Sequence, residues 1–273
     1  MNEVFIRGIL KKIIEDKVQN VEKEERKIGV YYPSELPFCI RRNYYLYTLK
    51  KELDIKTLLL FESGNMFHKW FNELFENSKY VELHVNEHEC FLRSGDITIK
   101  GRVDDYLYFK IKNMLQETPT FHPEKERNEE HEGKESKEET TEEEHQRKDS
   151  MKYDALSIVE VKSVRNISPL NFPRLHHVMQ LNFYLNRFNI DTGFIIYVDR
   201  RDLSFKIFEV NYDKSMFEEI VRRAKELHRY LLSGILPEAE ASRDKSMEWQ
   251  CSICGFRQEC IRSARASSGI RDK

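Results

Sequence analysis

Two charged side chains interrupt an otherwise apolar run that reads as a β-strand, YDALSIVEVK (residues 153–162). Glu160 and Lys162 are two residues apart in this run, so both project from the same face of the strand. Charges on a central strand are costly to bury unless they have a task. Upstream, the sequence GRVDD places Asp104 beside Asp105 in a second expected strand. The two runs therefore predict a group of charged side chains on one sheet.

These residue types fit the hydrolysis of a phosphodiester bond. If the two strands are neighbours, Asp104 and Glu160 can place two carboxylate oxygens on one divalent cation, Mg²⁺ or Mn²⁺. Lys162 would then orient or help to deprotonate an attacking water, and would stabilise the charge that develops on a phosphate. The alternative is an ion pair on a solvated face, which is the common role of an isolated Glu-x-Lys tripeptide.

Three of the five cysteines lie near the C-terminus with the spacing C-x2-C-x5-C, at Cys251, Cys254 and Cys260. A four-thiolate site needs one more, and Cys39 and Cys90 are the two candidates. Cys39 stands beside basic and aromatic residues, whereas Cys90 lies in an expected strand and is predicted to pack as a small buried hydrophobe. We therefore predict that Cys39 completes the site. The spacing fits Zn²⁺ and an iron-sulfur cluster equally.

Composition predicts a soluble, cytoplasmic protein. The chain has 273 residues and a formal net charge of −2, and no apolar stretch is long enough to span a membrane. Charged residues interrupt the apolar positions at the N-terminus, which excludes a signal peptide. An odd number of cysteines fits a metal site in a reducing compartment better than a set of disulfides.

Residues 117–150 are predicted to form a disordered or loosely helical acidic insertion. They contain thirteen acidic and six basic residues, with Phe121 as the one large apolar side chain. Such a segment cannot bury enough apolar surface to offset its ordering entropy. The rest of the chain then carries a net charge of +5. The insertion is either a spacer or a mimic of DNA that screens a basic surface.

Hydrophobic periodicity predicts an α/β fold with a mixed sheet flanked by helices. We expect helices over residues 1–24, 58–76, 171–187 and 214–233, an extended piece over 28–32, and a helix that begins at Ser34 as N-cap and carries Cys39. Strands are expected over residues 80–92, 97–109, 153–164, 192–198 and 203–210. The predicted regions are an N-terminal helical part (1–79), a core (80–235) and a C-terminal cysteine segment with a tail (236–273).

Other residues are weaker candidates for a site. Gln180 and Tyr184 lie one turn apart on an expected helix and can face the same point. His68 lies beside an aromatic stripe, and a histidine there is more often a boundary residue than a ligand. A basic and aromatic cluster predicts contacts with nucleic acid, although a helix with a solvated basic edge and buried tyrosines explains the cluster equally well. Its members are Arg41, Arg42, Tyr44 and Tyr45. His177, one turn before Gln180, is a further candidate substrate contact, with an ordinary surface role as its alternative.

Taken in order, these residues resemble one family. His68, Asp104, the triplet Glu160-Val161-Lys162, Gln180-x3-Tyr184 and the four cysteines look like the PD-(D/E)XK nucleases of RecB type, and specifically the CRISPR-associated iron-sulfur exonucleases. The resemblance extends from about Tyr32 to Cys260. The acidic insertion departs from the family pattern.

The resemblance implies a restriction-endonuclease-like core and a helical module that holds an iron-sulfur cluster, [4Fe-4S] or [2Fe-2S], on Cys39, Cys251, Cys254 and Cys260. It implies that His68, Asp104, Glu160 and the carbonyl of Val161 bind the catalytic metal. Lys162 would be the catalytic lysine, with Gln180 and Tyr184 completing the site. It further implies cleavage of single-stranded DNA ends, typically 5′ to 3′, and the processing of spacer precursors for the CRISPR integrase.

Two other functions remain open at this stage. One is a repair or viral RecB-like nuclease outside CRISPR. The other is a non-catalytic DNA-binding scaffold with a four-cysteine zinc site, in which the carboxylates do not converge. The combination of Asp104, Glu160 and Lys162 argues against the scaffold, because a scaffold has no use for three charges at one strand end. The oligomeric state does not follow from the sequence.

Overall fold

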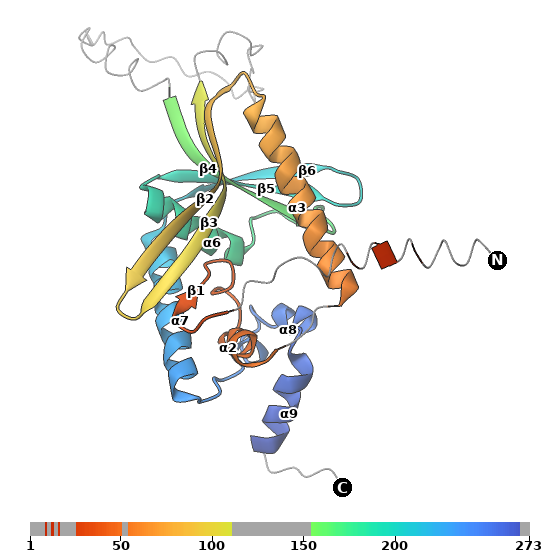
Figure 1. Cartoon of the computed structure of the whole chain (residues 1–273), viewed down its shortest axis with the longest axis vertical. Coiled ribbons are helices and arrows are strands. Elements are labelled where there is room, and N and C mark those ends of the chain that lie inside the picture. The colour runs from red at the N-terminus through yellow and green to blue at the C-terminus, as the bar shows by residue number, and fades with distance from the viewer. Residues whose placement is uncertain are drawn as a thin grey trace, which may run out of the picture.

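The computed structural model describes residues 26–50, 54–110 and 154–267, together with the isolated positions 9, 12, 13 and 16. The acidic insertion predicted for residues 117–150 lies outside the described residues, as does most of the helix predicted for residues 1–24. Figure 1 shows a central sheet with helices on both faces and a group of short helices beyond one end of the sheet.

The sheet has six strands in the order β1-β3-β4-β5-β6, with β2 paired to β3. β1 pairs with β3, and β4 with β5, in parallel; the other three pairings are antiparallel. The prediction of an α/β class with a mixed, helix-flanked sheet is thereby confirmed, and the strands that carry Asp104 and Glu160 are indeed neighbours. The strands are β1 (Val30–Tyr31), β2 (Val81–Ser94), β3 (Ile97–Lys110), β4 (Asp154–Val164), β5 (Thr192–Asp199) and β6 (Phe205–Asn211).

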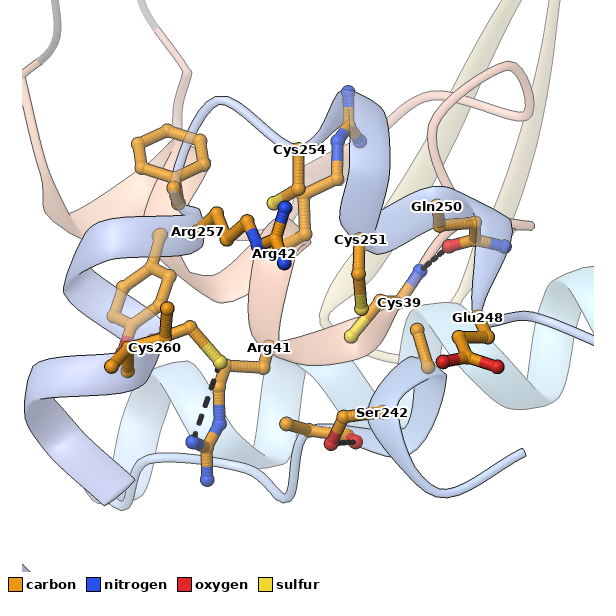
Figure 2. A pocket seen from close by; sticks show the side chains of 15 residues that line it. Cys39, Arg41, Arg42, Ser242, Glu248, Gln250, Cys251, Cys254, Arg257 and Cys260 are labelled. Atoms are coloured by element: carbon orange, nitrogen blue, oxygen red, sulfur yellow. Dashed lines mark hydrogen bonds between the residues drawn. The ribbon is translucent and has the colours of Figure 1, made fainter. Parts of the chain in front are cut away.

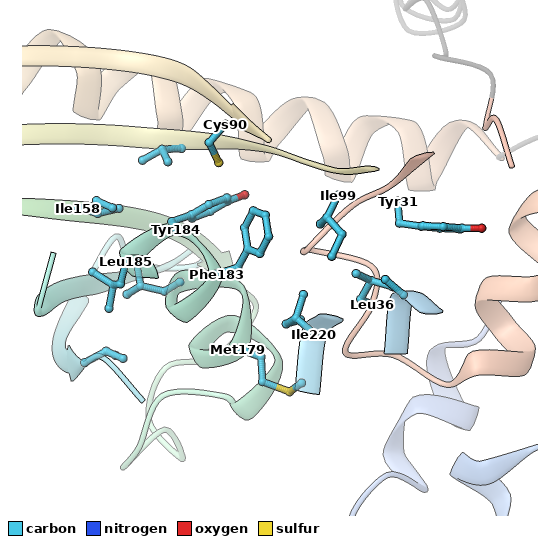
Figure 3. Packing of buried hydrophobic residues seen from close by; sticks show 14 of the residues in the cluster. Tyr31, Leu36, Cys90, Ile99, Ile158, Met179, Phe183, Tyr184, Leu185 and Ile220 are labelled. Carbon is cyan, nitrogen blue, oxygen red and sulfur yellow. The ribbon is translucent and has the colours of Figure 1, made fainter. Parts of the chain in front are cut away.

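Helices cover the sheet on both faces because each presents an apolar stripe to it. α3 (Ile55–Glu76) packs over a smaller core cluster that includes Phe71, Leu107 and Val161. α6 (Leu175–Phe188) and α7 (Lys214–Ser233) cover the other face over a larger cluster, part of which Figure 3 shows. Among the described helices, none is both long and apolar enough to cross a membrane.

The short helices lie at one end of the sheet and gather distant parts of the chain. They are α2 (Ile40–Thr48), the 3₁₀ turn η1 (Glu240–Ser242), α8 (Trp249–Ile253) and α9 (Arg257–Ser267). The prediction that a helix begins at Ser34 is wrong, because residues 33–37 form turns and α2 begins only after Cys39. Pro37 explains the difference, since a proline disfavours helical backbone at the residue before it.

The ladder between β3 and β4 ends beside the predicted catalytic residues. Its register runs from Lys110 opposite Asp154 to Asp105 opposite Val159, and the next residues are Asp104 and Glu160. On the other side of β3, the register pairs Asn86 with Asp105 and His88 with Val103, but Glu87 of β2 and Asp104 between them are not paired. Glu87 has a left-handed backbone conformation there (φ 49°). A non-glycine residue in this region is strained, and such strain occurs often at functional sites.

The aromatic ring of Tyr184 reaches its place because Gly101 of β3 has no side chain. A Cβ atom at Gly101 would lie 2.6 Å from Cε1 of Tyr184, 3.1 Å from Sγ of Cys90 and 3.2 Å from Cε1 of Phe183. All three neighbours are buried in the larger core cluster. The glycine therefore allows α6 to approach the sheet closely enough to place Tyr184 under the strand.

We predict that Gly101→Ala lowers the free energy of unfolding by about 1–3 kcal/mol, the usual cost of overpacking a core. Gly64→Ala is the matched control, because a Cβ there meets nothing closer than Ser163 Oγ at 4.0 Å and lies within α3. The control should be neutral or raise stability by up to about 1 kcal/mol. Urea unfolding of both variants checks this, and an equal effect of the two would contradict the close approach described here.

Candidate active site and cysteine cavity

Glu160 lies at the centre of the first site and is completely buried. Its Oε1 accepts a hydrogen bond from Nε2 of Gln180 at 2.7 Å and a second one from Nζ of Lys162. The amide nitrogen of Gln180 also lies 3.2 Å from the hydroxyl of Tyr184. Glu160 Oε2 has no hydrogen-bond partner among the described residues. β4 and α6 thus bring the four side chains together as predicted.

Asp104 faces the same region from β3. Its Oδ2 accepts a hydrogen bond of 3.1 Å from the backbone nitrogen of Val161. Val161 lies beyond the last residue of β4 that pairs with β3. The same oxygen lies 3.2 Å from Nδ1 of His68, which α3 contributes. Asp104, His68 and Lys162 are partly exposed, with 20–29% of each side chain accessible, so solvent reaches the site from their side.

The charges of these groups depend on one another. Burial raises the pKa of Glu160 to about 7, with the charge of Asp104 acting in the same direction and Lys162 against it. Burial would lower the pKa of Lys162, but Glu160 and Asp104 raise it overall. Burial would also raise the pKa of Asp104, yet Lys162 and His68 bring it below its usual value. At neutral pH the site therefore holds an ionised Asp104 near a protonated Lys162.

Asp105 helps to hold α3 against the sheet beside this site, a role that the sequence did not reveal. It is completely buried on the α3 side of the sheet, and its Oδ1 lies 2.7 Å from Nε2 of His84. Asn72 of α3, with its amide nitrogen turned toward the carboxylate, donates to the same oxygen at 2.7 Å and to the carbonyl of His68 at 3.3 Å. Asp105 thus ties α3 to the sheet one turn from His68. The Asp-Asp doublet was its only signal.

The four predicted cysteine ligands line one cavity of about 270 Å³, shown in Figure 2. None of them forms a disulfide. They come from the N-terminus of α2, from α8, from the link after it and from α9, at Cys39, Cys251, Cys254 and Cys260. Cys90 lies apart from them in the larger core cluster, so the prediction that it packs as a buried hydrophobe is confirmed.

Three arginines line the cysteine cavity, at Arg41, Arg42 and Arg257. Arg41 places Nη1 3.7 Å from Sγ of Cys260, and its Nε donates to the carbonyl of Pro237 at 2.6 Å. Arg42 lines the cavity near Cys254, and its guanidinium lies over the ring of Phe38, 4.6 Å from the ring centroid. Burial raises the pKa of the Cys254 thiol, and Arg42 opposes that shift.

The structure does not bring the predicted nucleic-acid-binding residues together on one surface. Arg41 and Arg42 lie beside the cysteines. Tyr45 is buried, and its hydroxyl lies 3.0 Å from Oγ of Ser263, so its ring offers no face to a base; this part of the prediction is wrong. Tyr44 packs against the larger core cluster, and Nδ1 of His177 lies 2.8 Å from the hydroxyl of Tyr197. Contacts of Arg41, Arg42, Tyr44 and His177 with nucleic acid stay a prediction.

No model of a known protein family matches the sequence, and no curated protein matches it. Among solved structures, SSO0001 matches with a TM-score of 0.53 and 21% sequence identity, over 95% of this chain and 98% of SSO0001. The chain shares the fold of SSO0001. An alkaline exonuclease (LHK-Exo) from Laribacter hongkongensis reaches a TM-score of 0.42 and 9% identity, over 77% of this chain and 91% of the exonuclease. The first similarity supports the fold, and the second is too low to add to it.

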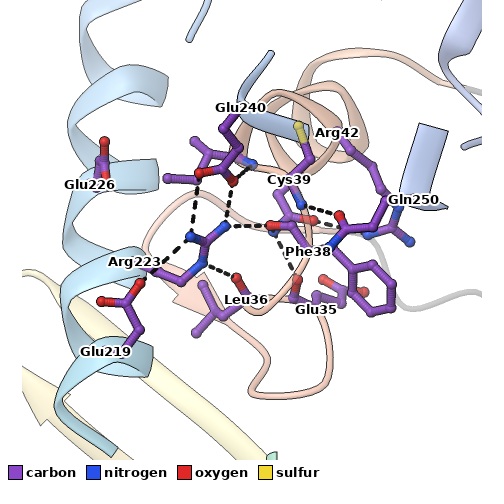
Figure 4. A network of polar contacts seen from close by, with 12 residues as sticks. Glu35, Leu36, Phe38, Cys39, Arg42, Glu219, Arg223, Glu226, Glu240 and Gln250 are labelled. Atoms are coloured by element: carbon purple, nitrogen blue, oxygen red, sulfur yellow. Dashed lines mark hydrogen bonds and ion pairs between the residues drawn. The ribbon is translucent and has the colours of Figure 1, made fainter. Parts of the chain in front are cut away.

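A buried polar network holds the segment that precedes Cys39, as Figure 4 shows. Arg223 of α7 donates from Nε to the carbonyl of Leu36 at 2.6 Å and from Nη2 to the carbonyl of Phe38 at 2.7 Å. The same nitrogen binds Oε1 of Glu240, which also accepts from the backbone nitrogen of Ile40 at 2.7 Å.

Gln250 completes this network next to the thiols. Its Oε1 accepts a hydrogen bond of 2.8 Å from the backbone nitrogen of Cys39. Gln250 immediately precedes Cys251, so one side chain links the two ends of the chain that supply cavity cysteines. Neither Arg223 nor Gln250 follows a sequence motif, and both were missed for that reason.

We predict that Arg223→Met lowers the free energy of unfolding by about 2–4 kcal/mol, because it removes the buried partner of Glu240 and leaves the carbonyls of Leu36 and Phe38 without a donor. Arg222→Met is the matched control on the same helix. Arg222 is 56% exposed and pairs with Glu219 and Glu226 at the surface, so its loss should cost no more than about 1 kcal/mol. Urea unfolding measures both, and equal losses would show that the network does not hold this end of the fold.

Proposed function

We propose that this protein is a metal-dependent nuclease that hydrolyses phosphodiester bonds in DNA. One observation carries the proposal: Asp104, Glu160 and Lys162 meet where the ladder between β3 and β4 ends, with His68 beside Asp104. A scaffold protein has no need to place two carboxylates and an ammonium group around a gap in a buried sheet, since unpaired charge there costs stability.

The residues present fit a divalent cation. A buried carboxylate oxygen without a hydrogen-bond donor is costly, and Glu160 Oε2 is such an atom among the described residues. Asp104, Glu160, His68 and the carbonyl of Val161 would hold the cation, which supplies Lewis acidity and lowers the pKa of water. No three His, Cys, Asp or Glu side chains of the described chain already converge on one point, so binding requires these ligands to draw closer together.

The chain's own side chains have separable roles in this proposal. Gln180 fixes the rotamer of Glu160 through its hydrogen bond, and Tyr184 in turn contacts Gln180. Lys162 stays protonated because both carboxylates raise its pKa. It therefore acts as a fixed positive charge that stabilises the negative charge developing on the phosphate, rather than as a base.

The finer proposal is a single-stranded DNA exonuclease of 5′ to 3′ polarity that processes spacer precursors, with a CRISPR integrase as partner. It is supported by the ordered resemblance to CRISPR-associated exonucleases of RecB type. A repair or viral nuclease outside CRISPR would use the same site, so the genes adjacent to this one distinguish the two contexts.

We predict that the protein cleaves end-labelled single-stranded DNA in the presence of Mn²⁺, and that Lys162→Ala lowers the rate by about 10²–10³, the usual cost of removing one transition-state charge partner. Lys214→Ala is the control, because Lys214 is 77% exposed on α7 and its ion-pair partner in the described part of the chain is Glu218. The order in which labelled products appear reports the polarity. Equal rates for wild type and Lys162→Ala, or no cleavage by either, would reject the proposed function.

We also propose that the cysteine cavity holds an iron-sulfur cluster. Four free thiols line it, the number of ligands that such a cluster needs, and the ordered resemblance to iron-sulfur exonucleases favours a cluster over zinc. Its thiolates would join residues more than two hundred positions apart, which contributes to folding stability.

Anaerobically purified wild-type protein should contain iron and acid-labile sulfide in equal amounts, and Cys251→Ser should lose both together with thermal stability. Cys90→Ala should keep both, because Cys90 lies in the core away from the cavity. Stoichiometric zinc without sulfide in the wild type would reject the cluster and leave the nuclease proposal standing.

A further inference from the structure

Three neighbouring strands present two rows of side chains on an outer face of the sheet. Tyr31 and Ile99 are completely buried and point into the core, as Figure 3 shows, so the residues that alternate with them project from the opposite face. One row follows the register from Val30 of β1 through Thr98 of β3 to Arg93 of β2.

In the second row, Lys100 of β3 lies opposite Phe91 of β2. Tyr32, the residue that directly follows β1, continues this row. Together the rows line a cavity of about 520 Å³, which we call the strand-face groove. Its lining residues are Lys27, Val30, Tyr32, Phe91, Arg93, Thr98 and Lys100.

The strand-face groove is basic. Lys27, Arg93 and Lys100 are three of its seven lining residues, and the described lining contains no carboxylate. Two carboxylates lie near its rim: Glu89, which is 3.0 Å from Nζ of Lys100, and Glu35, which pairs with Arg26. Glu89 is about half exposed, and a surface pair of this kind exchanges easily with another anion such as a phosphate.

Two aromatic rings lie among these cations. Phe91 is 46% exposed, so part of its ring is accessible from the groove. Tyr32 forms the other wall and carries the guanidinium of Arg26 over its ring, 4.8 Å from the centroid. Cations that track a backbone and aromatic faces on which bases stack are the combination that binds single-stranded nucleic acid without sequence preference.

The groove leads along one strand to the side of the candidate active site that Asp104 and His68 form. Lys100 and Asp104 are four residues apart on β3, a distance of about 13 Å. Arg102 lies between them, is 62% exposed and forms a surface ion pair with Glu87 of β2 at 3.8 Å, which a phosphate can replace. A polyanion that enters the groove can therefore follow β3 to the point where β3 and β4 separate.

We infer that the strand-face groove binds the unpaired DNA strand whose phosphodiester bond is cut beside Asp104, with phosphates on Lys27, Arg93 and Lys100 and bases against Phe91 and Tyr32. The inference rests on the proposed function, which supplies the substrate. It adds a binding surface outside the residues that perform the chemistry.

The test measures binding of labelled oligothymidylate by fluorescence anisotropy in the Lys162→Ala background with EDTA, so that neither residual activity nor a divalent cation allows cleavage. Adding Lys27→Glu and Arg93→Glu should reduce the slope of log Kd against log salt concentration by about 1.4, at about 0.7 for each lost phosphate contact. The control is Lys214→Glu with Lys245→Glu, which changes the net charge equally on exposed positions away from the groove. Its slope should not change.

A second comparison tests the stacking. Phe91→Ala should raise Kd at least about fivefold, the lower end for one stacked base. Phe205→Ala should leave Kd unchanged, because Phe205 is a 64% exposed phenylalanine on β6, across the sheet from the groove. Equal thermal midpoints of all variants show that folding is unaffected.

The outcomes separate the two proposals. If the wild type cuts DNA while the groove variants bind like their controls, the groove inference is rejected and the nuclease stands. If the wild type does not cut although the groove variants lose binding, the nuclease proposal fails and the groove remains a nucleic-acid site. Equal competition by duplex DNA of the same length would reject stacking on Phe91, because paired bases cannot reach the ring.

Discussion

The arrangement of this protein depends on burying one carboxylate, Glu160, in the centre of a sheet. An isolated buried charge would cost several kcal/mol, so its neighbours must supply compensation. Lys162 from the same strand and Gln180 from α6 donate to Oε1. Gln180 can reach Glu160 only if α6 packs closely against the sheet, and the missing side chain of Gly101 on β3 permits this close packing.

The separation of β3 from β4 is the second half of the same constraint. Once the ladder ends, the backbone nitrogen of Val161 needs another acceptor, and Asp104 provides it. Asp105, one residue later, points to the α3 side and binds His84. Consecutive carboxylates thus have different partners: Asp104 contacts His68 at the site, and Asp105 helps to hold the helix that carries His68.

Sequence reasoning predicted the parts of this protein that follow local periodicity. The helices and strands from residue 58 to 233 were expected within a few residues, and so were the neighbouring positions of Asp104 and Glu160. Alternation cannot reveal partners that meet only through tertiary structure, which is why Arg223 and Gln250 were missed. The prediction at Ser34 fails because Pro37 disfavours helical backbone at Leu36, and the one at Tyr45 because its burial depends on a distant helix, α9.

The pairing of Lys110 with Asp154 has a consequence for what this scaffold tolerates. The ladder between β3 and β4 holds the two ends of the segment between them side by side. The other end of this ladder lies about 17 Å away, next to Asp104 and Glu160. Closing a loop across ends that already touch depends only weakly on loop length. Evolution, or an engineer, can therefore exchange that segment for a reporter domain, an affinity tag or a short turn without altering the geometry at Glu160.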